Sequence, residues 1–228
     1  MINAIETHYA GCHFRSRLEA RWAVFFDALD IEWLYEPEGI TYYEYNYLPD
    51  FYLPRSHTWV EVKGSLDDVD WRKLSLAVDF GHLPNTCNGW DSKAPSAPGL
   101  LLLGNPPRPT RGHVPTFPLL QHYKGVRLEP AIFSPAGFLT QRQALNHDVA
   151  VLRYSSEERW QREAADFVER GLLYEEIFDG WLTSGTPTES WVKCIKAAWP
   201  EQRAWYRRPS WVATDRAFEL ARSARFGT

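Results

Sequence analysis

Apolar residues recur at helical spacing near the start of the chain, over residues 14–30 (FRSRLEARWAVFFDALD). One face of the predicted helix collects four large apolar side chains: Leu18, Trp22, Phe25 and Leu29. Glu19 lies about 100° around the helix axis from Leu18, at the border of the apolar face. From this position a carboxylate can extend past the core into a cleft. From this helix alone, a solvated carboxylate on the helix rim is the simpler interpretation.

Short apolar and aromatic runs separated by turn residues follow this helix. Residues 31–37 (IEWLYEP) and 40–47 (ITYYEYNY) are aromatic and β-branched, and the segment Pro37-Glu38-Gly39 interrupts them. This composition predicts two strands around a turn. Tyrosines recur at alternate positions of the second run, which indicates a sheet core more readily than a surface that stacks on bases.

The most informative stretch is residues 47–64 (YLPDFYLPRSHTWVEVKG), where two apolar runs flank a Pro-Arg-Ser-His segment. This pattern predicts a tight hairpin of two strands. Alternation along the second strand puts Glu61 and Lys63 on one face, and Val60 and Val62 on the core face. If the hairpin brings Asp50 beside them, two carboxylates and one ammonium converge. Such a set can hold a hard divalent cation next to a phosphate.

Beyond the hairpin, residues 67–80 (DDVDWRKLSLAVDF) predict a helix that opens with aspartates. Four leucines at 100–103 predict a short strand buried inside a sheet with helices over it. The segment 84–99 is rich in proline, glycine, asparagine and serine and predicts a long loop. Prolines dominate 105–118, so extended chain with little regular structure is expected there.

The C-terminal part differs in composition from the part before it. A strand is expected at 131–133, a helix over 156–171 that Gly171 ends, and shorter helices over 188–199 and 213–224. The change from β-rich to Trp- and Arg-rich helical sequence lies between residues 130 and 150. It predicts a core over 1–130 and a mainly helical extension over 131–228.

Composition and charge limit the classes of function. The 228 residues are 44% hydrophobic, which is enough for a core, and no apolar run is long enough to span a membrane. The first residues carry charges where a signal peptide needs an apolar stretch, so a soluble cytoplasmic protein is expected. The three cysteines lie far apart, which indicates neither a disulfide framework nor a zinc site. A net charge of −4 does not favour a nucleic-acid binder, although arginines gather locally.

The order of these elements resembles the PD-(D/E)XK nuclease superfamily. The segments Phe14–Glu19 (FRSRLE), Pro49–Pro54 (PDFYLP) and Glu61–Gly64 (EVKG) are similar to those of the junction-resolving endonucleases of T-odd phages and of uncharacterised phage and bacterial proteins with the same core. The likeness covers roughly residues 13–80. It implies a restriction-endonuclease-like α/β fold, in which a mixed central sheet is flanked by helices, here with a helical C-terminal appendage.

The resemblance also implies a chemistry for the predicted site. Asp50 and Glu61 would bind Mg²⁺ or Mn²⁺, with the backbone carbonyl of Val62 as a further ligand. Glu19 would complete a second metal position or hold a metal-bound water. Lys63 would orient the attacking water, help to deprotonate it, or stabilise the charge that develops on the phosphate. These roles make all four side chains candidate catalytic residues.

The implied function is that of a metal-dependent deoxyribonuclease of the endonuclease or resolvase type, which processes phage or mobile-element DNA. DNA is the expected partner, no membrane is expected, and specificity for branched DNA would require a homodimer. The candidate DNA contacts are four basic residues: Arg15, Arg17, Arg72 and Lys73.

Two other classes of function stay open at the level of sequence. The slightly acidic charge favours a catalytically weak nuclease-fold module that binds DNA or a protein partner. A metal hydrolase built on histidine is less well supported, because the seven histidines show no His-x-x-x-His or His-Asn-His spacing. His57, in the predicted hairpin turn, is the histidine expected nearest the site.

Overall fold

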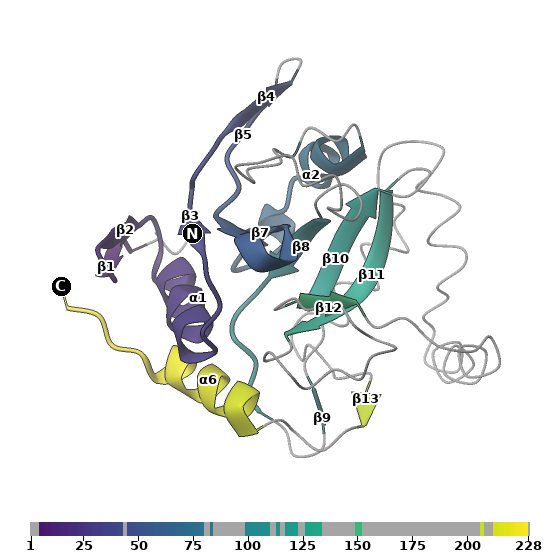
Figure 1. Cartoon of the computed structure of the whole chain (residues 1–228). Helices are drawn as coiled ribbons and strands as arrows, with labels where there is room; N and C mark the ends of the chain where they lie inside the picture. The colour runs from purple at the N-terminus through teal and green to yellow at the C-terminus, as the bar shows by residue number, and fades with distance from the viewer. Residues whose placement is uncertain are drawn as a thin grey trace.

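The computed structural model describes residues 5–42, 45–79, 83, 99–109, 113–114, 117–122, 126–133, 149–151, 206–207 and 212–227. A mixed sheet of seven strands forms its centre, in the order β12-β11-β10-β8-β7-β6-β3 (Figure 1). Its strands are β3 (Leu34–Tyr35), β6 (Phe51–Leu53), β7 (Thr58–Val62), β8 (Gly99–Leu103), β10 (Phe117–His122), β11 (Val126–Phe133) and β12 (Val149–Val151). Only β7 and β8 pair in parallel; the other neighbours in this sheet are antiparallel.

Three α-helices lie in the described part of the chain: α1 (Arg17–Ala28), α2 (Trp71–Asp79) and α6 (Val212–Ser223). Helices α1 and α6 pack against each other beside the sheet, and α2 lies apart from them (Figure 1). The chain is therefore a mixed α/β protein. None of these helices has the length and apolar character needed to cross a membrane.

Two hydrophobic clusters show which helix covers which face of the sheet. Alternate strand residues such as Val60, Val62 and Leu101 join the side chains of α1 and α6 in one cluster. The intervening residues, among them Trp59 and Leu100, join the side chains of α2 in the other. Because neighbouring residues of a strand point to opposite faces, the sheet is sandwiched between α1/α6 and α2. The alternation predicted for β7 is confirmed.

Sequence periodicity predicts several elements correctly. The helix expected over 14–30 is α1, and Ser16 caps it by accepting a hydrogen bond from the backbone N–H of Glu19 at 3.2 Å. The hairpin expected in 47–64 is β6 and β7, joined by the 3₁₀ turn η1 (Pro54–Ser56). The leucine strand is β8, fully buried between β7 and β10.

Other helices were also expected. The one predicted over 67–80 corresponds to the 3₁₀ turn η2 (Leu66–Asp68) followed by α2. The helix predicted over 213–224 corresponds to α6. The helices predicted over 156–171 and 188–199 lie outside the described residues, as does nearly all of the loop predicted over 84–99.

Strands occur in both of the runs predicted around Pro37-Glu38-Gly39, but the prediction of two strands joined by that turn is wrong. Strand β3 pairs with β6, whereas 40–47 contains two strands that pair with each other, β4 (Ile40–Tyr42) and β5 (Tyr45–Tyr47). Glu36, with φ of 43°, turns the chain after β3, and its backbone N–H donates to the carbonyl of Asp50 at 2.9 Å. The β4–β5 hairpin projects away from the central sheet (Figure 1).

Small hairpins and strands complete the described structure. Strands β1 (Thr7–Tyr9) and β2 (Cys12–Phe14) pair just before α1. Strand β9 (His113–Val114) pairs with β13 (Tyr206–Arg207). Strand β10 begins at Phe117, inside the segment expected to hold little regular structure, and β11 is longer than the strand expected at 131–133. Strand β11 crosses the boundary predicted near residue 130, and α6 of the predicted extension contributes to the core beside α1.

Candidate active site

Asp50 lies directly before β6 and is bound to the backbone of the neighbouring strand. Its Oδ2 accepts a hydrogen bond from the Val62 N–H at 2.7 Å, and its Oδ1 accepts one from Arg15 Nη2 at 3.2 Å. The register pairs Phe51 with Val60, which brings the start of β6 beside the end of β7. Asp50 is only 3% exposed. The hairpin thus places this carboxylate next to the strand that carries the other two predicted residues.

Glu61 and Lys63 lie together at the end of β7, on the same face of the strand as Trp59. Glu61 Oε1 and Lys63 Nζ are 2.6 Å apart, and Glu61 Oε2 accepts a hydrogen bond from the Tyr47 hydroxyl at 2.9 Å. The Lys63 N–H donates to the carbonyl of Leu103 at 2.9 Å, so the backbone stays paired with β8 just beyond the end of β7. Glu61 is 5% exposed. The ion pair is therefore held on a strand at the centre of the sheet.

Glu19 enters the site from the first turn of α1 and is bound by three donors. Its Oε1 accepts from the Ser16 hydroxyl at 2.6 Å, and its Oε2 accepts from the Tyr35 hydroxyl at 2.7 Å and from the Arg15 N–H at 3.2 Å. Its exposed fraction is 7%, so the interpretation of Glu19 as a solvated residue on the helix rim is wrong. The same carboxylate also stabilises the start of the helix, in the manner of a capping box.

Arg15 connects Glu19 to Asp50. Its backbone N–H binds Glu19, and its guanidinium forms ion pairs with both Asp50 and Glu36. The side chain is 57% exposed, so the guanidinium can move without opening the core. Through Arg15, the structure brings the helix carboxylate and the hairpin carboxylate into one network.

The carboxylates repel one another. Burial raises the pKa of Asp50 well above its usual range, and the negative charges of Glu61 and Glu19 raise it further. The hydrogen bond from Val62 and the charge of Lys63 oppose this rise without cancelling it. An added cation would therefore lower the cost of keeping Asp50 ionised.

Lys63 keeps its proton firmly. Burial by itself would lower the pKa of Lys63, but the adjacent charge of Glu61, its hydrogen bond and the charge of Asp50 outweigh burial, so the pKa is raised. The Lys63 side chain is also partly exposed, so its ammonium is within reach of a ligand.

The donor atoms suit a hard divalent cation, because carboxylate oxygens are the ligands that Mg²⁺ and Mn²⁺ prefer. Among the described residues, however, no three His, Cys, Asp or Glu side chains already form a set of metal ligands. The oxygens of Glu61 and Glu19 face Lys63, Tyr47 and other donors within the protein instead. A metal would thus exchange some of these hydrogen bonds for coordination, and the ligand role expected for the Val62 carbonyl stays a prediction.

The four candidate DNA contacts occupy different parts of the structure. Of the four candidate DNA contacts, Arg15 is part of the site and Arg17 is exposed on the first turn of α1. Arg72 lies on α2 with its guanidinium carbon 5.8 Å from the centre of the Tyr45 ring. Lys73 is half-buried on the same helix.

His57 lies in the hairpin turn, in the left-handed conformation (φ 49°), with Nδ1 3.2 Å from the Tyr52 hydroxyl. Tyr52, the partner in that hydrogen bond, is not a residue of the candidate active site.

Sequence reasoning missed the two tyrosines that hold the carboxylates. Tyr35 binds Glu19 and Tyr47 binds Glu61, across 16 and 14 residues of chain respectively. Such bonds between distant segments leave no local pattern. By contrast, the partnership of Ser16 with Glu19 is visible in the sequence as a Ser-x-x-Glu capping pattern.

Comparisons with known proteins add no family to these observations. No family model matches the chain, and neither a curated protein nor a solved structure matches it. A function for this chain therefore follows from the residues of the site and their geometry.

Proposed function

We propose that this protein is a metal-dependent nuclease with a restriction-endonuclease-like core that hydrolyses phosphodiester bonds in DNA. The observation that carries the proposal is the convergence of Asp50, Glu61 and Lys63 at the buried end of the β6–β7 hairpin, with Glu19 joined to them by Arg15. A structural ion pair does not need three carboxylates in mutual repulsion. A buried carboxyl group whose pKa is raised, as that of Asp50 is, is typical of functional sites.

Each residue has a defined role in the proposed reaction. Asp50 and Glu61, with Glu19 beside them, would hold Mg²⁺ or Mn²⁺. When bound, this cation would supply positive charge to the phosphate and lower the pKa of a water. Lys63 is protonated, so its ammonium is suited to orient the attacking water or to stabilise charge on a phosphate oxygen. Arg15, partly exposed, could turn from Asp50 towards a phosphate once a cation takes its place.

The fold is compatible with this proposal. The parallel pair β7–β8 at the centre of a mixed sheet, flanked by α1 on one face and α2 on the other, suits the arrangement that the sequence resemblance implies. Processing of phage or mobile-element DNA, endonuclease or resolvase action, and a homodimer that recognises branched DNA belong to the same proposal. They rest on the resemblance of the motifs.

The test is cleavage of labelled duplex, single-stranded and four-way-junction DNA, and of RNA, with Mg²⁺, Mn²⁺ or EDTA. We expect metal-dependent cleavage of DNA that falls about 10³-fold or more in Asp50→Asn and in Lys63→Ala, because each removes charge from the reacting centre. The matched control is Asp68→Asn, an exposed carboxylate on η2, which should cleave normally. Undiminished cleavage in both site variants would contradict the assignment.

A second candidate is a module with a nuclease fold that binds DNA or a protein partner without efficient catalysis. It is favoured by one observation: the oxygens of Glu19 and Glu61 already face donors within the protein, and the described residues contain no ready set of metal ligands. Thermal unfolding with and without Mn²⁺ separates the candidates. A stabilisation that Asp50→Asn abolishes supports the nuclease, whereas no change favours the module.

A further inference from the structure

Glu36 is a fourth carboxylate beside the candidate active site. It follows β3, and its backbone N–H donates to the carbonyl of Asp50 at 2.9 Å. Its side chain is 21% exposed and forms an ion pair with Arg15. Glu36 Oε1 is buried and finds no hydrogen-bond donor among the described residues, so Arg15 is the cation that balances it there. Glu36 is thus fixed to the segment that carries Asp50, and the two residues share a partner.

One nitrogen of Arg15 serves both carboxylates. Nη2 is the atom that pairs with Glu36 Oε1 and, at 3.2 Å, with Asp50 Oδ1. Two acidic oxygens from different segments therefore face a single positive nitrogen, as they would face a bound cation. The charge of Asp50 is in this way balanced in part by a cation that belongs to the chain itself.

Asp50 and Arg15 differ in how easily they can move. The other oxygen of Asp50 accepts a hydrogen bond from the Val62 N–H at 2.7 Å, and the Asp50 side chain is 5% exposed. The Arg15 side chain is 57% exposed. A metal that binds Asp50 would therefore displace the guanidinium and leave the carboxylate in place. Glu36 is then the anion that keeps the guanidinium from moving away into solvent.

We propose that Glu36 is a positioning residue of the active site. It holds the Arg15 guanidinium as an internal cation on Asp50, and it keeps that guanidinium beside the site when a divalent metal takes over Asp50. The proposal rests on the proposed function, because the retained guanidinium would then bind the phosphate of the substrate.

The chemistry of arginine suits both tasks. Its planar guanidinium carries five N–H donors, so one edge can stay on Glu36 while another binds phosphate oxygens. A guanidinium that is already held in place also loses less side-chain entropy when the phosphate arrives.

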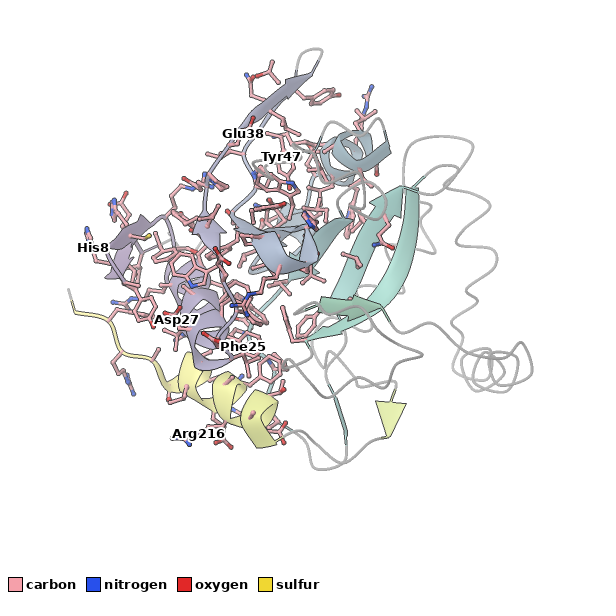
Figure 2. All side chains as sticks on the ribbon, in the orientation of Figure 1. His8, Phe25, Asp27, Glu38, Tyr47 and Arg216 are labelled. Atoms are coloured by element: carbon pink, nitrogen blue, oxygen red, sulfur yellow. The ribbon has the colours of Figure 1, made fainter. Side chains whose placement is uncertain are left out.

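The first test measures the binding of Mn²⁺ alone, by titration calorimetry or from the EPR signal of free Mn²⁺, without nucleic acid. It compares the unmodified chain with Arg15→Gln, Glu36→Gln and the double variant. Binding that persists in Asp50→Asn is assigned to other sites. The matched control is Glu38→Gln, which removes an exposed carboxylate at the base of the β4–β5 hairpin (Figure 2).

These variants should keep the fold, as circular dichroism can verify. Arg15 binds Glu19 and Tyr35 through its backbone N–H, and Glu36 likewise binds the carbonyl of Asp50 through its backbone. Glutamine at either position leaves these hydrogen bonds in place.

We expect Arg15→Gln to bind Mn²⁺ about fivefold more tightly, because the metal no longer competes with a guanidinium for Asp50. Glu36→Gln should bind Mn²⁺ about threefold more weakly, because the displaced guanidinium loses the carboxylate that receives it. In the Arg15→Gln background, Glu36→Gln should have no further effect. Equal weakening in both backgrounds would show that Glu36 acts on the metal by its charge alone, and it would overturn the proposal. Tighter Mn²⁺ binding in Glu36→Gln would overturn it as well.

The second test measures the binding of a labelled duplex in saturating Ca²⁺, a hard cation that binds oxygen ligands, and in EDTA. Electrophoresis checks that the duplex stays intact. Loss of a carboxylate by itself favours binding of a polyanion, so Glu38→Gln should bind the duplex as well as the unmodified chain or slightly better. In Ca²⁺, Glu36→Gln should instead bind it about threefold more weakly, because Arg15 is no longer held towards the phosphate.

This weakening should be absent in EDTA and in the Arg15→Gln background. Unchanged or tighter binding of the duplex by Glu36→Gln in Ca²⁺ would overturn the positioning role.

The two tests separate this inference from the proposed function. Independent effects of Glu36→Gln and Arg15→Gln, with normal metal-dependent cleavage, would overturn the role of Glu36 and leave the nuclease proposal intact. Coupled effects on Mn²⁺ and on duplex binding, in a chain that cleaves no DNA, would keep the role of Glu36 and refute the nuclease.

Discussion

The two faces of the central sheet differ in what they bury. The face under α1 and α6 is packed with aromatic rings that are at most 1% exposed: Phe14, Trp22, Phe25, Phe26, Phe51, Phe117, Phe133 and Phe218. The face under α2 is mainly aliphatic and includes Tyr47, whose hydroxyl binds Glu61. Strand β7 serves both, since Val60 and Val62 point into the aromatic face and Glu61 points the other way.

This difference shows how the fold can support a costly site. The aromatic rings form edge-to-face and stacked pairs, such as Phe25 with Phe218 at 4.4 Å between ring centres, where α1 meets α6. Such pairs add stability beyond the area that they bury. One face of β7 is therefore fixed by packing, and this holds the carboxylates on the other side in place although they repel one another. The comparison predicts that removing an aromatic ring from one face lowers stability, whereas neutralising a buried carboxylate on the other face raises it.

The largest effect is expected on the aromatic face. Phe218→Ala removes a fully buried ring that contacts Phe25, Trp22 and Phe117, so it should lower the free energy of unfolding by about 3–5 kcal/mol. Chemical denaturation measures this loss. Leu220→Ala, on the same helix but 44% exposed, is the control and should change stability by less than about 0.5 kcal/mol. A small loss in Phe218→Ala would mean that α6 adds little to the core.

On the charged side, a substitution should stabilise. Because the pKa of Asp50 is raised in the folded state, the folded protein binds this proton more tightly than the unfolded chain does. Stability therefore falls as the pH rises above the unfolded pKa, near 3.8, and through the raised folded value. In EDTA, Asp50→Asn should be more stable than the unmodified chain at pH 8, and about equal to it near pH 4.

Thermal unfolding at the two pH values measures this difference, with Asp68→Asn as the exposed control. A less stable Asp50→Asn at pH 8 would show that the bonds from Val62 and Arg15 outweigh burial and repulsion. The two faces would then not differ in the way proposed, because both would be stabilised by the side chains that they bury.

Strong periodicity and compact motifs predicted much of the described fold. Helices α1 and α6, the β6–β7 hairpin and β8 each carry a local pattern that tertiary contacts reinforce. The hairpin of 40–47 does not, since no glycine or proline separates its two strands. Strand β10 was hidden for another reason: Pro118 lies opposite Pro130 in its ladder, and proline normally argues against an internal strand.

The site shows the same division between local and distant information. Asp50, Glu61 and Lys63 come from one hairpin, so alternation and turn residues suffice to bring them together. The partners of the carboxylates, Tyr35 and Tyr47, come from strands whose pairing was wrongly predicted or not predicted. Side-chain hydrogen bonds of this kind depend on the final packing of distant segments, which a single sequence does not encode in any short pattern.

The smallest effect is expected at the rim of the aromatic face, where the hydroxyl of a tyrosine binds an exposed carboxylate at the protein surface. The Tyr9 hydroxyl donates to Asp27 Oδ2 at 2.7 Å, and Asp27 Oδ1 keeps a second donor, Trp33 Nε1, at 2.8 Å. Tyr9→Phe should therefore lower Tm by only about 1–2 °C near pH 8, as calorimetry can measure.

This small difference should also depend on pH. Partial burial, then the hydrogen bond to Asp27, raises the pKa of Tyr9 to about 12 from its usual 10.0. Between these values the unfolded chain loses the proton that the folded protein keeps, so the stability contributed by Tyr9 is complete below pH 10.0 and is lost as the pH rises through about 12. Tyr9→Phe and the unmodified chain should accordingly converge in stability at alkaline pH. A difference that stays constant from pH 8 to pH 11.5 or so would show that the loss comes from packing against Phe226, and that the rim of this face is stabilised like its interior.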